Sequence, residues 1–132
     1  MTVKDASKLA TFHTGCLRKI CRIFWPNTIS NKNLLNITKQ EDIRTTIRRR
    51  RWQWVGHALR RDRDNIARVA LTWTPEGKRR RGRPKTTWRR TLEAEALAQN
   101  KTWKDLETLA KDRHAWSDFV AALCANGCKE DK

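Results

Sequence analysis

The sequence predicts a small all-α protein, a bundle of about five or six helices with a basic Gly/Pro loop between two of them. Apolar residues recur at intervals of three and four along nearly the whole chain, as they do on one face of an amphipathic helix. Neither a strand hairpin nor an internal repeat is visible. The 132 residues suffice for one domain or for a pair of small helical ones.

Two helices are predicted before residue 40. The first is expected from about Ser7 to Phe24, where apolar residues have helical spacing: Leu9, Phe12, Cys16, Leu17, Ile20 and Phe24. Pro26 then disfavours a helical conformation in the residue before it. Ser30 is a good N-cap, because its side-chain oxygen can accept a hydrogen bond from a free backbone amide. The short helix that it begins carries Leu34, Leu35 and Ile37.

A third helix is predicted to open near Lys39, with Glu41 and Asp42 in its first turn, where the helix dipole favours negative charge. The apolar residues expected on one side of this helix are Ile43, Ile47, Trp54, Val55 and Ala58. The run Arg48–Arg51 covers one full turn, so at least two of its side chains must point at solvent or at a ligand. His57 is expected at the edge of the core, bonded to a backbone carbonyl.

Three further helical segments complete the prediction. A fourth helix is expected from Asn65 to about Thr72, and a fifth from about Thr86 to Gln99. Thr102 and Asp105 have the spacing of a capping box, which begins the last helical stretch. That stretch is expected to be one helix, or two helices with a break near Asp112. The predicted organisation is a helical part over 1–73, a basic loop over 74–85 and a second helical part over 86–132.

Charge is concentrated in the middle of the chain. The net charge is +16, and the segment from Arg44 to Arg90 holds 17 basic and 3 acidic residues, a net +14. A positive field of this density attracts polyanions, of which nucleic acid is the commonest. A membrane surface is the rival, but no apolar run approaches the ~20 residues that span a bilayer, and no signal peptide is visible. We therefore expect an intracellular protein, nuclear or cytoplasmic, that binds RNA or DNA.

Tryptophan and cysteine raise two structural questions. The seven tryptophans are expected to be mostly core residues, because each buried indole contributes up to ~250 Å2 of contact. Trp52 and Trp54 are the alternative candidates for base stacking. The cysteines, Cys16, Cys21, Cys124 and Cys128, lack the usual C-x2-C spacing of structural zinc sites, so they are expected to be reduced thiols. A composite zinc site with His13 and His114 is the alternative; we expect no metal and no cofactor.

The segment KRRRGRPK, residues 78–85, has two interpretations. One is a solvated turn whose charges contact phosphates. The other is an AT-hook-like element, in which Arg81 and Arg83 enter a narrow minor groove, Gly82 allows close approach and Pro84 fixes the exit. Together with the arginine-rich helix, the segment gives the predicted nucleic-acid-binding residues: Arg48, Arg49, Arg50, Arg51, Arg60, Arg61, Lys78, Arg79, Arg80, Arg81, Gly82, Arg83, Pro84, Lys85, Arg89 and Arg90.

No active site is visible in the sequence. Two-metal polymerases and nucleases need a tight group of carboxylates, and the chain has no adjacent Asp pair and no carboxylate cluster in an apolar setting. A Gly-rich phosphate loop, G-x-S-x-G and H-E-x-x-H are also missing. We therefore expect a protein that is not an enzyme and has no catalytic residues.

The order of the motifs resembles a known arrangement. The motifs are CLRKICRIFWPNTISNKNLL, RRRRWQWVGHALRRD, PEGKRRRGRPKTTWRRTLEAE and TWKDLETLAKDRHAWSDFVAALC. This series, from about Lys8 to Cys124, is similar to the C-terminal, post-polymerase region of non-LTR retrotransposon endonuclease–reverse transcriptases.

The resemblance implies thumb-like helices over 1–73 and a basic part that helps to hold template RNA or target DNA. The positions that match are Arg48 to Arg51, Trp52, Trp54, Gly56 and His57, then Arg81, Gly82, Arg83, Pro84, Lys85, Trp88, Arg89 and Arg90. The polymerase's catalytic aspartates and the endonuclease domain have no counterpart in the sequence, so the activity is not carried over, and the chain looks like a truncated copy or a fragment. The alternatives are an interaction module that docks on an acidic protein or a reverse transcriptase core, a free-standing AT-hook-like DNA binder, and a non-functional relic.

Overall fold

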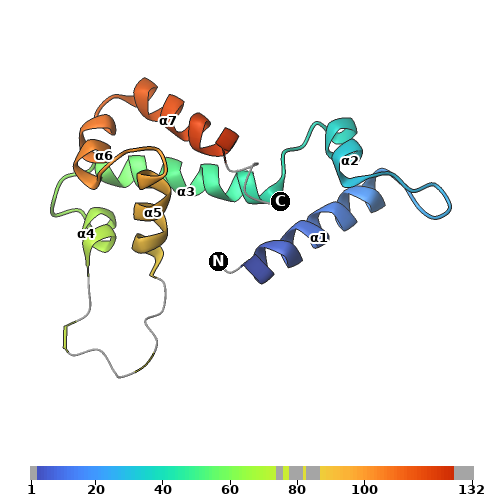
Figure 1. Cartoon of the computed structure of the whole chain (residues 1–132), viewed down its shortest axis with the longest axis horizontal. Helices are drawn as coiled ribbons and strands as arrows, with labels where there is room; N and C mark the ends of the chain where they lie inside the picture. Colours follow the sequence, from blue (N-terminus) through green and yellow to red (C-terminus); the bar gives the residue numbers. More distant parts are fainter. Residues whose placement is uncertain (1–2, 74–75, 78–81, 83–86, 127–132) are drawn as a thin grey trace. The chain divides into compact units, whose positions relative to one another are not determined.

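The computed structural model describes residues 3–73, 76–77, 82 and 87–126, and these form seven helices and no strand (Figure 1). The predicted all-α class is confirmed, with seven helices in place of five or six. The chain divides into two compact units, Met1–Arg50 and Arg51–Lys132, called unit 1 and unit 2 below. The division does not follow the expected boundary at residue 73, because helices on both sides of the basic loop share one hydrophobic core.

Unit 1 contains α1 (Val3–Ile20), α2 (Asn31–Thr38) and the beginning of α3 (Ile43–Leu59). Helix α1 ends at Ile20, and not at Phe24 as expected. The cause is local, because Arg22 adopts a positive φ of 53° and the amide of Ile23 bonds back to the carbonyl of Arg18 at 2.9 Å. A left-handed residue of this kind ends a helix while satisfying its last carbonyls.

The ends of α2 and the start of α3 also have identifiable causes. The Ser30 side chain accepts a hydrogen bond from the Asn33 amide at 3.2 Å, which confirms the predicted N-cap. Lys39 was expected to open the third helix, but its φ of 50° makes it the left-handed C-cap of α2. Helix α3 therefore begins only at Ile43, where Asp42 accepts a hydrogen bond from the amide of the second helical residue, at 2.9 Å.

Unit 1 buries little of its apolar surface. Leu34 on α2 is its one buried hydrophobic side chain among the described residues. The stripe that predicted α1 lies largely exposed, with Phe12 at 71% and Ile20 at 76% of their full accessible surface. The connection between α1 and α2 is held by Arg18, whose guanidinium donates to the Ile29 carbonyl at 3.2 Å and to the Asn31 side chain at 2.6 Å.

Unit 2 contains the rest of α3 and four further helices: α4 (Ile66–Thr72), α5 (Trp88–Leu97), α6 (Trp103–Leu109) and α7 (Arg113–Asn126). Asn65 caps α4 and Thr87 caps α5, close to the predicted starts of these helices. The capping box predicted at Thr102 is present at the start of α6. The break near Asp112 is real, because the Asp112 carboxylate accepts hydrogen bonds from the amides of the second and third residues of α7.

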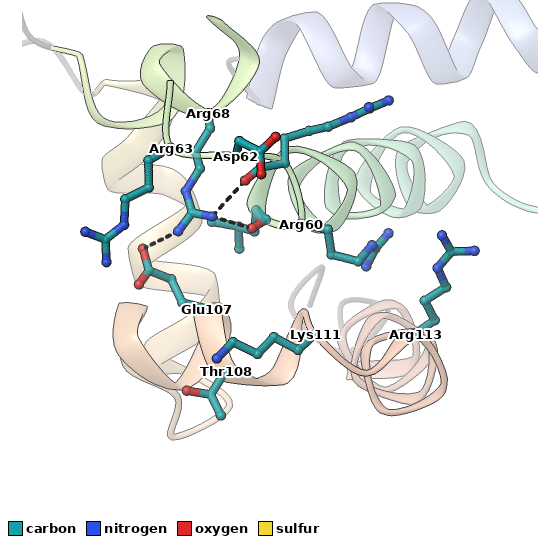
Figure 2. A pocket seen from close by; sticks show the side chains of 10 residues that line it. Arg60, Asp62, Arg63, Arg68, Glu107, Thr108, Lys111 and Arg113 are labelled. Atoms are coloured by element: carbon teal, nitrogen blue, oxygen red, sulfur yellow. Dashed lines mark hydrogen bonds and ion pairs between the residues drawn. The ribbon is translucent and has the colours of Figure 1, made fainter. Parts of the chain in front are cut away.

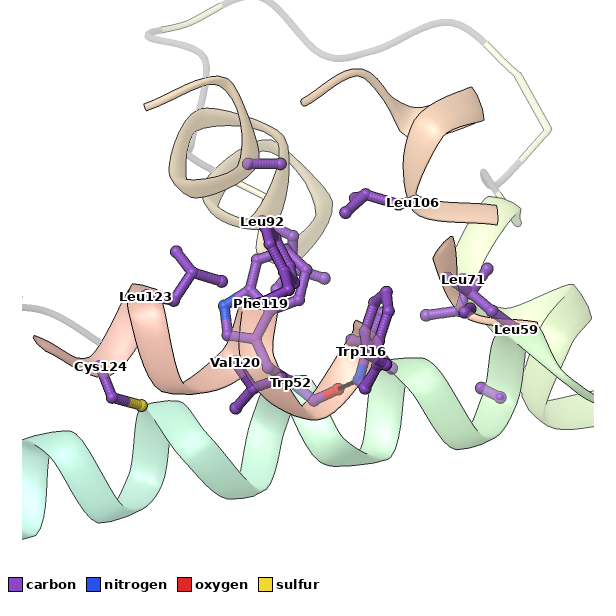
Figure 3. Packing of buried hydrophobic residues seen from close by; sticks show 14 residues of the cluster. Trp52, Leu59, Leu71, Leu92, Leu106, Trp116, Phe119, Val120, Leu123 and Cys124 are labelled. Atoms are coloured by element: carbon purple, nitrogen blue, oxygen red, sulfur yellow. Dashed lines mark hydrogen bonds between the residues drawn. The ribbon is translucent and has the colours of Figure 1, made fainter. Parts of the chain in front are cut away.

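The core of unit 2 is built around two tryptophans and a phenylalanine (Figure 3). The rings of Trp52 and Phe119 meet edge to face with centroids 5.4 Å apart, and Trp116 lies 6.1 Å from Trp52 and 5.5 Å from Phe119. Leucines from α3, α4, α5, α6 and α7 belong to the same cluster: Leu59, Leu71, Leu92, Leu106 and Leu123. The core therefore joins every helix of the unit.

Trp116 lies directly on the backbone of α3 (Figure 3). Its indole nitrogen donates to the Trp52 carbonyl at 3.1 Å, and a Cβ added at Gly56 would lie 2.2 Å from the same nitrogen. Only glycine leaves room for this approach. The glycine in the W-Q-W-V-G-H motif is thus a packing requirement of unit 2.

The expectation that most tryptophans are core residues holds only in part. Trp52 and Trp116 are buried, and Trp103 packs against the core. Four others are substantially exposed: Trp25, Trp54, Trp73 and Trp88. The apolar side predicted for α3 was partly wrong, since the helix buries Trp52 and exposes Trp54. Among the described helices, none has both the length and the apolar character needed to cross a membrane.

Candidate nucleic-acid interface

A basic groove of about 750 Å3 opens in unit 2 between the end of α3, the start of α4, α6 and the start of α7 (Figure 2). Six of its lining residues are cationic and two are acidic: Arg60, Arg61, Arg63, Arg68, Lys111 and Arg113 against Asp62 and Glu107. A concave surface lined by one sign of charge focuses its potential on an incoming ion of the opposite sign. The groove is therefore the strongest candidate for anion binding within the described part of unit 2.

Two of the groove's arginines hold its walls together. Arg68 donates to the Leu59 carbonyl at 2.8 Å and to the Arg61 carbonyl at 2.9 Å, and lies 3.7 Å from the Glu107 carboxylate. These carbonyls lie at the end of α3, where no following turn of helix satisfies them. Arg60 acts in the same way on the carbonyl of Ala110, the C-cap of α6, at 3.1 Å. Both arginines thus fix the loop and helix ends that shape the groove.

Three other cationic side chains of the groove have no polar partner among the described residues. The side chains of Arg63, Lys111 and Arg113 are exposed and make no hydrogen bond or ion pair within the described structure. Figure 2 shows them on three sides of the groove. Arg61 is also exposed, and its guanidinium contacts Nε2 of His57 at 3.1 and 3.3 Å. Unpaired guanidinium and ammonium groups around a hollow are suited to phosphate oxygens.

Several predicted binding residues are committed to carboxylates instead. Arg49 makes a two-pronged ion pair with Glu41 at 2.6 Å, and Arg51 pairs with Glu95. Arg89 bonds Glu93 at 2.8 Å and also lies 5.2 Å from the centre of the Trp103 ring. Arg48 is half-buried and has an interaction of its own. Only Arg50 and Arg90, of the predicted arginines on α3 and α5, are exposed without a polar side-chain partner among the described residues.

The structure separates the two tryptophans proposed for base stacking. Trp52 is fully buried and its indole nitrogen donates to Glu95 at 2.7 Å, so stacking by Trp52 is wrong for this fold. Trp54 is 43% exposed. His57 was expected at the core edge, bonded to a carbonyl; it is exposed, and its contact is with Arg61.

Most of the predicted binding residues of the basic loop are not described by the structure. Lys78, Arg79, Arg80, Arg81, Arg83, Pro84 and Lys85 lie outside the described residues. Gly82 is described, and its φ of 146° lies in a region that residues with a side chain rarely adopt, which suits a glycine.

Among the described residues no group of three or more His, Cys, Asp or Glu side chains is placed to hold a metal ion. Cys16 and Cys21 are free thiols, Cys124 is buried, and Cys128 lies outside the described part.

Sequence reasoning missed Arg63, Lys111 and Arg113. Two of them lie in the segment after Arg90, whose net charge is −2. Three acids of that segment are engaged by arginines from the middle of the chain, in the pairs Arg51–Glu95, Arg68–Glu107 and Arg89–Glu93. The pairing neutralises these three acids, whereas Lys111 and Arg113 have no polar side-chain partner among the described residues. The helix break at Asp112, which the sequence did indicate, was the available signal that Lys111 and Arg113 flank a helix junction.

Comparison of the chain with protein-family models, with curated proteins and with solved structures finds no match.

Proposed function

We propose that the chain binds RNA or DNA mainly through phosphate contacts, without catalysis, and that the basic groove of unit 2 is the principal contact surface. The observation that carries the proposal is the set of unpaired cations around the groove, Arg63, Lys111 and Arg113, next to Arg61. Phosphate contacts hold a nucleic acid in place but carry no base information. The proposed binding is therefore strong in low salt and indifferent to sequence.

The resemblance to the post-polymerase region of non-LTR reverse transcriptases supports the same proposal, because that region is expected to hold template RNA or target DNA. An intracellular site of action, nuclear or cytoplasmic, belongs to the proposal. The residues of the basic loop, 78–85, belong to it as additional phosphate or minor-groove contacts.

The test is a salt series with purified protein and duplex DNA, single-stranded DNA and RNA. Each phosphate neutralised contributes about −0.9 to the slope of log K against log salt on duplex DNA. The triple variant Arg63→Ala, Lys111→Ala, Arg113→Ala should lose three contacts, which makes the slope less steep by about 2.7. A slope that is unchanged by the variant, or a flat response of the wild type, contradicts the proposal.

A matched control removes the same charge elsewhere. Lys8, Lys19 and Lys32 are exposed residues of unit 1 without polar side-chain partners among the described residues. The variant Lys8→Ala, Lys19→Ala, Lys32→Ala has the same net charge as the groove variant. It should retain most of the affinity; an equal loss in both variants would mean that net charge, and not the groove, holds the nucleic acid.

A second candidate function is docking onto a partner protein, such as an acidic protein or a polymerase core. The exposed apolar residues of α1, Leu9, Phe12 and Ile20, favour it. Under this hypothesis an association survives nuclease treatment and is lost in the variant Phe12→Asp, Ile20→Asp. Loss of association on nuclease treatment leaves nucleic-acid binding as the better account.

A further inference from the structure

Two exposed tryptophans from different helices meet on the surface of unit 2. Trp54 of α3 is 43% exposed and Trp88 of α5 is 42% exposed. Their rings are in contact edge to face, with centroids 5.6 Å apart and planes at 70°. In the same unit, Trp52 and Trp116 are buried in the core. Leaving two large indoles half in water is therefore a distinct feature of this surface.

The position of this pair is fixed by a second link between the same helices. The Arg51–Glu95 ion pair joins α3 to α5, and Glu95 also accepts the indole hydrogen bond of Trp52. Arg51 lies three residues before Trp54 and Glu95 lies seven after Trp88, so each ion-pair partner is at helical spacing from the tryptophan of its own helix. The two rings are thus held in place before any ligand binds, which lowers the entropic cost of binding.

Cations and polar groups continue from the tryptophan pair toward the basic groove. His57 follows Trp54 by three residues on the exposed side of α3, and its Nε2 contacts the guanidinium of Arg61. Arg61 in turn lines the groove. An aromatic surface is therefore continuous with a phosphate-binding one.

We infer that the Trp54–Trp88 pair stacks on the bases of a single-stranded nucleic acid whose phosphates lie in the basic groove. The exposed face of an indole ring recognises the face of a base, and only an unpaired strand presents that face. Duplex bases are stacked on one another, so a duplex contacts the same protein through phosphates alone. This inference rests on the proposed function and adds to it the class of nucleic acid.

The experiment compares ligands that differ only in their bases. The wild-type protein is titrated with an oligothymidine and with an abasic deoxyribose-phosphate oligomer of the same length, which carries the same phosphates. Stacking predicts that oligothymidine binds about tenfold more tightly or better. It also predicts that Trp54→Leu or Trp88→Leu removes most of this difference and leaves the affinity for the abasic oligomer unchanged.

Two controls separate stacking from general effects. Trp73 is 67% exposed and contacts no other ring among the described residues, so Trp73→Leu should keep the preference for oligothymidine. Trp54→Phe retains an aromatic face, so this variant should keep a part of the preference for oligothymidine. The far-ultraviolet circular dichroism of each variant shows whether the helices have formed, and two independent leucine variants guard against the misfolding of one.

The outcomes distinguish this inference from the function on which it rests. If both oligomers bind equally tightly, the phosphate proposal stands and base stacking is overturned. If the preference for oligothymidine survives both leucine variants, or is lost equally in Trp73→Leu, the assignment to Trp54 and Trp88 is overturned. If neither oligomer binds at low salt, the proposed function itself fails.

Discussion

Unit 1 and unit 2 differ in how many of their apolar side chains they bury. Unit 2 gathers 14 buried residues from its helices into one cluster. Unit 1 buries a single hydrophobic side chain, Leu34, among its described residues. Yet α1 of unit 1 has the clearest apolar stripe of the sequence, whereas the core-forming half of α3 directly follows a run of four arginines.

The difference shows what an amphipathic pattern decides and what it does not. A stripe at helical spacing fixes which face of a helix is apolar. Burial of that face requires other helices to cover it. In unit 2 five helices cover one another's apolar faces. In unit 1, α2 and the beginning of α3 leave much of the apolar face of α1 exposed. The stability of the chain should therefore depend mainly on residues of unit 2, and paired substitutions in the two units test this.

The largest contrast is expected between Trp52→Ala and Phe12→Ala. Trp52 is fully buried at the centre of the core, and removal of a buried aromatic side chain costs about 3 to 5 kcal/mol of unfolding free energy. Phe12 is 71% exposed, and its removal should change the free energy by less than about 0.5 kcal/mol. Urea denaturation followed by circular dichroism measures both. A large loss in Phe12→Ala would show that the stripe of α1 is covered in solution.

The two helical glycines should respond to alanine with opposite signs. At Gly56 a Cβ would lie 2.2 to 2.7 Å from the indole of Trp116, so the buried ring must shift, at a cost of about 1 to 3 kcal/mol. At Gly15, inside α1, a Cβ meets nothing within 4 Å, and alanine should stabilise the helix by about 0.5 to 1 kcal/mol. Amide hydrogen exchange resolves the two units separately. A neutral Gly56→Ala would contradict the close packing of Trp116.

Local rules predicted much of the helical fold from the sequence. The caps at Ser30 and Thr102 and the possible break at Asp112 were foreseen, because each depends on a side chain bonding to its own backbone neighbours. The end of α1 was not predicted, because an arginine in the sequence gives no indication that its backbone adopts a left-handed conformation, as Arg22 does. The burial of Trp52 in place of Trp54 depends on Trp116, which lies 64 residues away in the sequence.

The candidate site was less predictable than the fold. The density of arginines in the middle of the chain indicated a basic region, but the sequence does not show which arginines meet a carboxylate. Arg51 and Arg89 are engaged by acids of α5, and the free cations Lys111 and Arg113 come from the segment with a net negative charge. Charge summed along the sequence therefore located the region and not the residues.

A smaller contrast is expected between the two glutamates that hold arginines of α3. Glu95 pairs with Arg51 in a largely buried setting and also accepts the Trp52 indole proton, so Glu95→Gln should cost about 1 to 2 kcal/mol. The Glu41–Arg49 pair of unit 1 is 40% exposed on both sides, and Glu41→Gln should cost less than about 1 kcal/mol. Denaturation in low and high salt checks both values. Equal costs would mean that the partial burial of the Glu95 pair adds nothing.

The smallest effect concerns acid and the caps of two helices. In the capping box of α6, the Thr102 amide and then its hydroxyl donate to Asp105, at 2.8 and 2.7 Å, and they hold the pKa of this carboxyl below its ordinary value of 3.8. A carboxyl whose pKa is lowered by folding contributes stability above its unfolded pKa. That contribution is lost as the pH falls through the lower folded pKa.

Acid should therefore weaken the cap of α6 in unit 2 and leave the cap of α2 in unit 1 unchanged, because the Ser30 hydroxyl does not titrate in this range. An NMR titration should show the Asp105 carboxyl titrating below pH 3.8, with the Thr102 amide shifting alongside it. The Asn33 amide, which donates to Ser30, should stay constant over the same range. Asp105→Asn should abolish the shift at Thr102. A Thr102 amide that still titrates in this variant would assign the effect to another acid and remove the contrast between the two caps.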